Sequence, residues 1–326
     1  MRILVTGATG KVGQVFISRL LAESRWPDAE VVALCHNRTP APAARLETVH
    51  GSISDRTVVA RALEGVTHVV HMATVKEDPA TAMDVSVKGM FWLLEEFRQS
   101  PTAEQFVLIG GDCVVGHCFV PYDAPVTETS PRRAYPGVYA LSKVLEEVML
   151  EQAQVQYGVN GTILRAPWIM EKDDFRYALS FGEDQFGGPG WATLISEEAR
   201  RQYAADQRVP VLIAADGKPL KRNFVHVEDL VGAMLAALDN PAARQQLFNI
   251  SMTRPVDYLE MAQHLERTRG MVGVEIATPF HSNALDNAKA RHLLGWEPAY
   301  DLGRLIDSAF DYVRAPGDVR KVWYVG

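Results

Sequence analysis

The feature that most constrains this chain is an alternation of strand-like and helix-like segments that starts at its first residues. The expected strands are short, continuous apolar runs, and the segments between them carry apolar residues at helical spacing. We expect strands at residues 2–6, 30–35, 67–73, 106–109, 161–166, 224–227 and 246–251, and helices at about 12–24, 57–63, 82–99, 139–157 and 228–238. Strands that are separated by helices form parallel sheets. The sequence therefore predicts an α/β fold with a doubly wound parallel sheet.

The alternation is interrupted after Arg165. The residues that follow mix glycine, proline, tryptophan and charge, and the run FGGPG at 186–190 fits either a plain surface turn or a substrate lid. We expect two parts of unequal size. The larger is a sheet domain formed by residues 1–166 and rejoined by 222–252, and the smaller is a lobe formed mainly by residues 167–221 and 253–326.

Composition and charge exclude several classes of protein. The chain has 326 residues, 47% of them hydrophobic, which is enough apolar mass for a large core. Its net charge of −7 argues against a nucleic-acid partner, which would require a basic face. No apolar run is long enough to span a bilayer, and glycine interrupts the opening MRILVTG too early for a signal peptide. We therefore expect no membrane partner and a cytoplasmic location.

Cysteine and histidine give no sign of a disulfide framework or a metal site. The three cysteines, Cys35, Cys113 and Cys118, form neither an even set nor a metal-binding spacing. The nine histidines are scattered and form no HExxH pattern. We expect reduced cysteines and no catalytic metal.

A glycine-rich turn, VTGATGKVG, joins the first expected strand to the first expected helix. Gly7, Gly10 and Gly13 have the spacing GxxGxxG. Glycine permits the tight turn and lets the backbone approach a pyrophosphate, whose charge then faces the helix N-terminus. The alternative is a strand-to-helix turn without a ligand. Its position directly after an N-terminal strand favours the binding of a dinucleotide.

The end of the second expected strand bears on the choice of cofactor. An acid usually stands there when the cofactor is NAD, because it binds the ribose 2′-hydroxyl. Here the strand ends Leu34-Cys35-His36-Asn37-Arg38, without an acid. Arg38, with His36, could receive a 2′-phosphate through charge-assisted hydrogen bonds, or Arg38 could be a solvated loop residue. The sequence favours NADP over NAD.

The stretch YALSK places Tyr139 and Lys143 four residues apart, on one face of a helix. A lysine ammonium beside a phenol favours the phenolate and lowers the pKa of the tyrosine. Tyr139 could therefore accept a proton while an alcohol is oxidised by hydride transfer. The motif is common by chance, but it gains specificity from the glycine-rich turn upstream.

Taken together, these stretches resemble the extended short-chain dehydrogenase/reductases of the NAD(P)-dependent epimerase/dehydratase family. The stretches that match, in the family's order, are TGATGKVG, HVVHMAT, VKGMFWLLE, YALSK, RNFVHVEDL, LFNIS and KARHLLGW. The resemblance implies a Rossmann-type domain with a bound nicotinamide cofactor and a smaller C-terminal substrate-binding lobe over the carboxyl edge of the sheet. It also implies a sugar, sugar acid or nucleotide sugar as the substrate.

The resemblance assigns roles residue by residue. Tyr139 and Lys143 match the catalytic pair. The expected cofactor-binding residues are Gly7, Thr9, Gly10, Lys11, Val12, Gly13, Arg38, Ser52, Ile53, Met72, Ala73, Tyr139 and Lys143, and the expected substrate-binding residues are Gly111, Trp168 and Arg222.

Several positions depart from the family pattern. Ser52 replaces an aspartate on the adenine side, and Ser86 replaces an asparagine. Gly111 stands where the family has a catalytic serine or threonine, so the usual hydroxyl donor is missing. The stretch ATPFHSNALD lacks an arginine that nucleotide-sugar members carry, although Arg222 matches their other phosphate-binding arginine. A free sugar or sugar acid is therefore an alternative to a nucleotide sugar.

Asp112 and Cys113 follow Gly111 at the end of a buried strand. The position of Asp112 matches an acid of the family's dehydratases, and that of Cys113 matches an acid or base cysteine of some epimerases. The alternatives are a turn-capping carboxylate and a small buried hydrophobic residue. A thiol has a reference pKa of about 8.5, close to neutrality. We expect one or both side chains to move a proton at the sugar.

Three functions remain open. The first is an epimerase or dehydratase cycle that oxidises a sugar hydroxyl and returns the hydride. The second is a net dehydrogenase or reductase, and the third is a cofactor-binding protein without catalysis, which the glycine at position 111 would allow. We also expect a homodimer, because the helices at 90–97 and 139–150 carry more apolar positions than one sheet-facing stripe requires: Met90, Trp92, Leu93, Leu94 and Phe97. The resemblance points to the same two helices.

Overall fold

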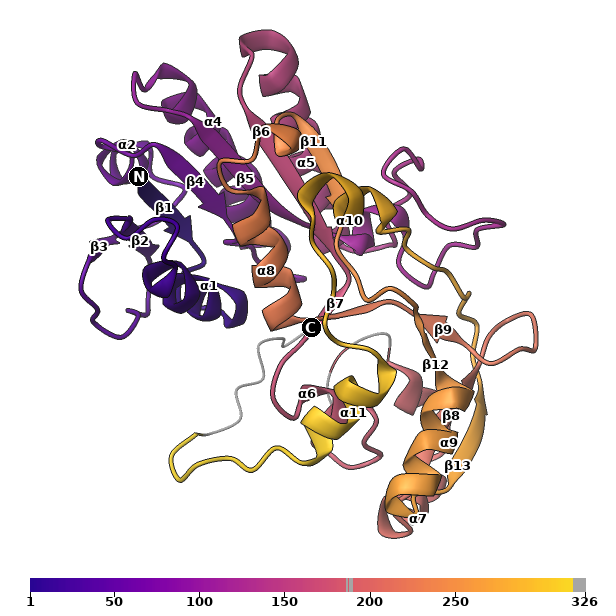
Figure 1. The fold of residues 1–326 in the computed structure, drawn as a ribbon. Coiled ribbons are helices and arrows are strands. Elements are labelled where there is room, and N and C mark those ends of the chain that lie inside the picture. The colour runs from indigo at the N-terminus through magenta and orange to yellow at the C-terminus, as the bar shows by residue number, and fades with distance from the viewer. Residues whose placement is uncertain (186, 188–189, 319–326) are drawn as a thin grey trace.

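The core of the protein is a seven-stranded sheet in which all strands run parallel (Figure 1). The computed structural model describes residues 1–185, 187 and 190–318. The strand order is β11-β6-β5-β4-β1-β2-β3, with β1 Arg2–Thr6, β2 Glu30–Cys35, β3 Leu46–His50, β4 His68–His71, β5 Gln105–Gly111, β6 Gly161–Ala166 and β11 Gln246–Asn249. The chain order reverses between β1 and β4, so the prediction of a doubly wound parallel sheet is confirmed.

Helices cover both faces of this sheet, which explains why its strands are apolar throughout. On one face lie α1 (Lys11–Ala22) and α8 (Val227–Ala237), whose Phe16, Leu20 and Met234 are buried with strand residues in one core. On the other face lie α2 (Arg56–Ala62), α4 (Gly89–Gln99) and α5 (Val138–Tyr157), which bury a second core. Every residue of β5 is buried, as its continuous apolar sequence predicts.

The elements expected for the sheet domain are found with shifted ends, and the structure adds strand β3 to the sheet. Strand β3 is not predicted from sequence, because Glu47, Thr48 and His50 interrupt its apolar residues, and its position at the edge of the sheet needs few apolar side chains. The helix expected over 82–99 is three segments: α3 Pro79–Ala82, a π-helix η1 at Met83–Lys88, and α4. The buried Ser86 lies in the π-helix. Such segments are rare and often mark functional sites.

A second body of structure lies below the carboxyl edge of the sheet, in the lower half of Figure 1. It contains α6 (Asp174–Ala178), α7 (Glu197–Ala205), α9 (Tyr258–Arg269) and α11 (Leu302–Phe310), together with β8 (Val209–Ile213) paired with β13 (Gly273–Ala277) and β9 (Lys221–Arg222) paired with β12 (Val256–Asp257). Its core is separate and includes Phe175, Phe181, Trp191 and Tyr258.

The segment 224–227, expected as a strand of the main sheet, instead forms β10 (Phe224–His226). It pairs with β7 (Trp168–Met170) in a two-stranded ribbon outside the main sheet. Phe224 packs in the core of the second body, and Val225 packs in that of the first. This ribbon therefore connects the two cores beside the carboxyl edge of the sheet.

The C-terminal part of the chain returns to the sheet domain through Asp229. Its buried carboxylate accepts hydrogen bonds from the backbone N–H groups of Ala299 and Tyr300, each at 2.9 Å. The Trp296 indole donates to the Asp229 carbonyl at 3.0 Å. The short helix α10 (Ala288–Leu294) is thereby held against α8, with Ala290 and Leu294 in the first core.

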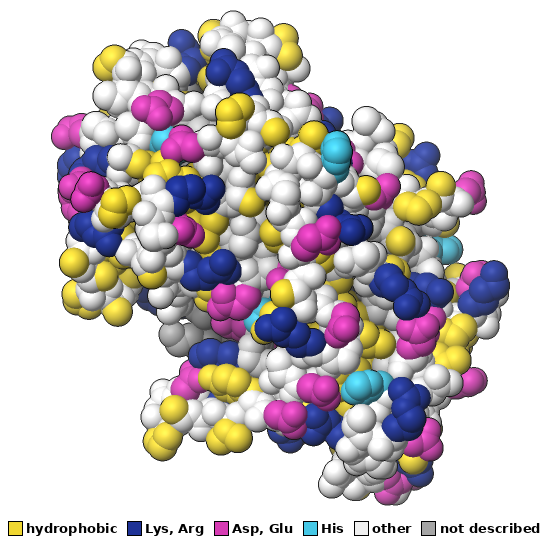
Figure 2. All heavy atoms as spheres, viewed as in Figure 1, with side chains coloured by type: hydrophobic (Ala, Val, Ile, Leu, Met, Phe, Trp, Pro, Cys, Tyr) yellow, Lys and Arg dark blue, Asp and Glu magenta, His cyan; other side chains and the backbone are white. Residues whose placement is uncertain are grey.

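The surface carries charges of both signs. On the face shown in Figure 2, Lys and Arg side chains alternate with Asp and Glu side chains and do not gather into a basic stripe. No helix in the described part of the chain is both long and apolar enough to cross a bilayer. The run FGGPG was expected to form a surface turn or a substrate lid, and three of its residues (186, 188 and 189) lie outside the described residues.

Candidate active site

A cavity of about 1050 Å³ opens at the carboxyl ends of β1, β4, β5 and β6. This is the edge where parallel α/β sheets bind ligands. Every residue predicted from sequence to bind cofactor or substrate, or to act in catalysis, lines this cavity. The structure thus brings together groups that are separated by more than 200 residues in the sequence.

The glycine-rich turn leaves open space at the start of α1. Gly7 has φ +69°, and a Cβ on it would lie 2.9 Å from the Met72 carbonyl carbon. A Cβ on Gly13 would overlap the Gly7 carbonyl oxygen. Gly10 caps α1 without a side-chain hydrogen bond, so the first N–H groups of the helix face the cavity. This backbone cradle fits the pyrophosphate of a dinucleotide.

Lys11 reaches away from this cradle. Its ammonium donates to the Ile169 carbonyl at 3.0 Å and forms an ion pair with Asp174 of α6. Both side chains of the pair are buried. Only the backbone N–H group of Lys11 is therefore placed to contact the cofactor as expected. Its side chain instead links the glycine-rich turn to the second body.

At the far end of the cavity, Arg38 and His36 follow β2, and Ser52 and Ile53 follow β3. The Ser52 hydroxyl lies 2.8 Å from that of Ser54, within hydrogen-bonding distance. Ile53 is buried, and a Cβ on Gly89 of α4 would lie 2.7 Å from its side chain. This end presents a cation and hydroxyl groups but no carboxylate among its described lining residues.

Tyr139 and Lys143 lie on one face of the first turns of α5, as their spacing predicts. The Lys143 ammonium donates to the Ile109 carbonyl of β5 at 3.1 Å and to the Glu146 carboxylate at 2.7 Å. Burial raises the pKa of Glu146, and the ammonium of Lys143 opposes that rise. These contacts hold Lys143 at the carboxyl end of β5, beside the cavity.

The space beside Gly111 is filled by a thiol. A Cβ on Gly111 would lie 3.0 Å from Cys113 Sγ and 3.6 Å from the Tyr139 hydroxyl oxygen. Cys113 therefore stands beside the place where the family's hydroxyl side chain would begin. Burial, with the charge of Asp112, raises the pKa of Cys113 to about 12. The thiol therefore stays protonated at neutral pH, where it can donate a hydrogen bond.

Asp112 is engaged by a histidine that sequence reasoning missed. Its carboxylate accepts a hydrogen bond from His117 Nδ1 at 2.6 Å, and Arg222 Nε donates to His117 Nε2 at 3.1 Å. Burial opposes a charged ring, but the carboxylate of Asp112 outweighs it and raises the pKa of His117 to about 9. The contact with Arg222, however, requires an unprotonated Nε2. Protonation of His117 would therefore break that contact.

Arg222 and Trp168 form the wall of the cavity that belongs to the second body. The buried Arg222 guanidinium lies 4.1 Å from the centre of the Trp168 ring. Trp168 in turn stacks on Phe224, with ring centres 5.7 Å apart. Two of the three predicted substrate-binding residues, Trp168 and Arg222, are thus in contact with each other.

Lys76 is a second cavity residue that sequence reasoning missed. It follows β4 by five residues, and its ammonium lies 3.7 Å from the centre of the Tyr139 ring. Both Lys76 and His117 come shortly after the carboxyl ends of strands. The rule that selected Asp112 and Cys113 would have included them if it had been applied to longer loops.

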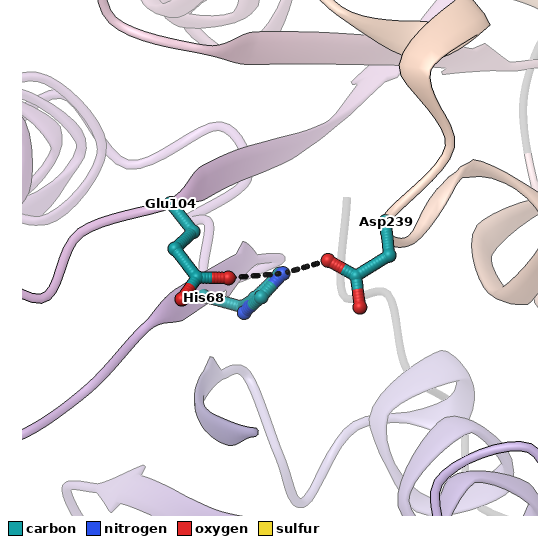
Figure 3. Close-up of side chains that lie close together, drawn as sticks. All are labelled: His68, Glu104 and Asp239. Atoms are coloured by element: carbon teal, nitrogen blue, oxygen red, sulfur yellow. Dashed lines mark hydrogen bonds and ion pairs between the residues drawn. The ribbon is translucent and has the colours of Figure 1, made fainter.

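A histidine and two carboxylates lie at the other edge of the sheet (Figure 3). The ligand atoms of His68, Glu104 and Asp239 are within 4.8 Å of one another. His68 Nε2 is hydrogen-bonded to Asp239 at 2.8 Å, and Nδ1 lies 2.7 Å from the Thr67 hydroxyl. Because both ring nitrogens have protein partners, we interpret this cluster as a structural tie between β4 and the end of α8.

These features define a dinucleotide-dependent enzyme of the Rossmann type, with a tyrosine–lysine pair at the carboxyl edge of the sheet. The family model described as the NAD dependent epimerase/dehydratase family matches residues 3–251. The chain belongs to this family and is an NAD(P)-dependent enzyme of this type.

Comparison with individual proteins agrees with the family match. The chain is 28% identical to a UDP-glucose 4-epimerase of Lacticaseibacillus casei over 96% of each sequence. Its structure is similar to a short-chain dehydrogenase/reductase superfamily protein from Agrobacterium tumefaciens with bound NAD (TM-score 0.77, 22% identity, 96% and 97% of the two chains). It is also similar to a UDP-glucuronic acid 4-epimerase from Bacillus cereus in complex with NAD (TM-score 0.71, 22% identity, 96% of each chain).

Proposed function

We propose that this protein oxidises a sugar hydroxyl by hydride transfer within an epimerase or dehydratase cycle. The observation that carries the proposal is the convergence of the Tyr139 hydroxyl and the Cys113 thiol on the space beside Gly111. One group accepts a proton and the other donates a hydrogen bond, as the oxidation of an alcohol requires. A nicotinamide cofactor held in this cavity would supply the hydride acceptor.

The residues of this chain have separate roles in cofactor binding, proton transfer and substrate binding. Gly7, Gly10 and Gly13 hold the cofactor pyrophosphate, and Lys143 keeps the Tyr139 phenol near its phenolate form. Cys113 donates to the substrate oxygen in place of the missing hydroxyl. Asp112 orients His117 at the wall of the cavity.

The function is tested by turnover on a panel of free sugars, sugar acids and nucleotide sugars. The cofactor bound to the purified protein is identified by mass at the start. Turnover without added cofactor supports the proposed cycle. A stoichiometric change in absorbance of the reduced nicotinamide would indicate a net dehydrogenase or reductase instead, and tight binding without turnover would indicate a cofactor-binding protein.

We propose a nucleotide sugar or a sugar acid as the substrate. The buried Arg222, packed on Trp168, supplies a cation for a phosphate or a carboxylate. UDP-sugar epimerases among the comparison proteins support the first choice. The second body, built mainly from residues 167–221 and 253–326, is proposed as the substrate lobe.

We further propose a preference for NADP, because Arg38 and His36 stand where an acid would bind the 2′-hydroxyl of NAD. Arg38→Ala should lower the affinity for NADP by about tenfold or more and leave that for NAD within about twofold, on the scale of one charge-assisted hydrogen bond. Titration calorimetry with both cofactors measures the ratio. Tighter binding of NAD by the wild type, with a silent Arg38→Ala, would contradict the preference.

We also propose a homodimer, with an interface formed by other residues than those expected from sequence. Met90, Leu93, Leu94 and Phe97 are buried in the chain's own core, since they pack under α2 and against the sheet. The exposed apolar side chains near the expected seam are Met83, Phe91 and Leu141.

We expect a dimer in sedimentation experiments at micromolar concentration, and Phe91→Glu should shift it toward monomer, because a charge would be buried at the seam. The matched control is Val155→Glu at the exposed end of α5. A wild-type monomer at that concentration would refute the homodimer.

A further inference from the structure

Lys76 and Glu77, two residues that follow β4, contact the proposed proton acceptor Tyr139 at its ring and at its backbone. Glu77 accepts hydrogen bonds from the backbone N–H groups of Val138 and Tyr139 at the start of α5, at 2.7 and 3.4 Å. Lys76 places its ammonium on the face of the Tyr139 ring, 3.7 Å from the ring centre. The dipeptide thus fixes both the backbone and the ring of Tyr139.

The position of Lys76 has an electrostatic consequence. Negative charge on a phenolate spreads into its ring, and a cation on the ring face stabilises that charge at short range. Lys143 supplies a first cation from the next turn of α5, at the end of β5. A second cation from a different element makes the phenolate more favourable than one lysine alone would.

We propose that Lys76 and Glu77 position Tyr139 and that Lys76 supplies a second cation that sets the pH range over which Tyr139 accepts a proton. This role rests on the proposed function only in that Tyr139 is the proton acceptor. Lys76 acts on the tyrosine and is a positioning residue; it is not assigned a contact with the substrate.

The charged groups around Lys76 determine its pKa and therefore the pH at which it loses its positive charge. The titratable and charged groups that face it and Tyr139 are Lys143, Glu77, Asp112, Cys113 and Tyr135. Burial lowers the pKa of Lys76 to about 8; Lys143 acts in the same direction, while Cys113, Glu77 and Asp112 oppose it. Lys76 is therefore charged at neutral pH and loses its charge as the pH rises through about 8.

A titration without substrate tests the proposal directly. The ultraviolet absorbance of tyrosinate is followed against pH in the holoenzyme, and subtraction of the same curve for Tyr139→Phe isolates Tyr139. Lys76→Met should raise the pKa of Tyr139 by about one unit, equivalent to about tenfold in its ionisation constant. Lys76→Arg keeps a positive charge beside the ring, so it should change the pKa of Tyr139 by no more than about half a unit. Lys218→Met, on an exposed turn, is the control and should not change the curve.

Turnover adds a second readout. Turnover depends on the phenolate of Tyr139 and should rise with pH, so Lys76→Met should move this rise to higher pH by about one unit. Lys76→Arg keeps a positive charge and should leave the rise within about half a unit of the wild type. Lys76→Gln replaces Lys76→Met if the latter does not fold. An unchanged pKa of Tyr139 in a folded Lys76→Met or Lys76→Gln, or an equal shift in Lys76→Arg, would overturn the proposal. Because the titration needs no sugar, failure of the proposed substrate class would leave its result intact.

Discussion

Tyr139→Phe is expected to abolish measurable turnover while the cofactor remains bound. The substitution removes a hydroxyl that lies beside the Gly111 space and on the face of α5 that carries Lys143. Loss of a general acid or base costs from about a hundredfold to about ten-thousandfold in rate. Binding should persist, because the pyrophosphate is held by the glycine turn and the N-terminus of α1.

The measurement pairs steady-state kinetics with calorimetric cofactor binding. Tyr157→Phe, at the exposed end of the same helix, is the matched control and should behave as wild type. Lys143→Ala should weaken both turnover and binding, since its ammonium lines the cofactor cavity as well as adjusting Tyr139. Near-full activity of Tyr139→Phe would show that another group accepts the proton.

Cys113→Ala is expected to lower turnover by about a hundredfold, the lower end of the range for a lost proton-handling group. The thiol lies next to the place from which a family hydroxyl would extend, and burial keeps it protonated. Asp112→Asn should lower turnover less, because it disturbs the orientation of His117 without removing a group from the substrate. Cys118→Ala, a buried thiol outside the cavity, is the control.

A second substitution separates chemistry from packing. Gly111→Ser alone should reduce activity, since its Cβ would lie 3.0 Å from Cys113 Sγ, tighter than ordinary contacts. In the Cys113→Ala background the same serine has room, and it should restore at least about tenfold of the lost rate by supplying a hydroxyl donor. If Cys113→Ala and Asp112→Asn both retain wild-type rates on the true substrate, the stretch serves packing and a turn.

The sequence predicted those parts of the site that depend on local pattern. A continuous apolar run located β5, and the spacing of Tyr139 and Lys143 placed both on one helical face. The same reasoning could not find β3, because LETVH lacks the apolar continuity of a buried strand. Nor could it show that residues 224–226 leave the main sheet, since pairing partners are not encoded in the strand itself.

The partners of several site residues come from distant parts of the chain and could not be predicted from sequence. His117 meets Arg222 across 105 residues, and Lys11 meets Asp174 across 163. The sequence pattern around each of these residues does not indicate which distant residue it contacts. Buried and exposed positions of α4 could not be told apart from sequence for a related reason. Its apolar residues look alike in sequence, whereas packing under α2 buries some of them and leaves Phe91 exposed.

The buried Lys11–Asp174 pair has a mechanical consequence. Any swing of the lower body away from the sheet would separate the carboxylate of Asp174 in α6 from the ammonium of Lys11 at the start of α1. The pair therefore links the second body to the sheet domain and opposes hinge opening. Ligands would then enter and leave through the existing mouth of the cleft, and the rate of product release would follow the motion of its rim rather than the parting of two halves.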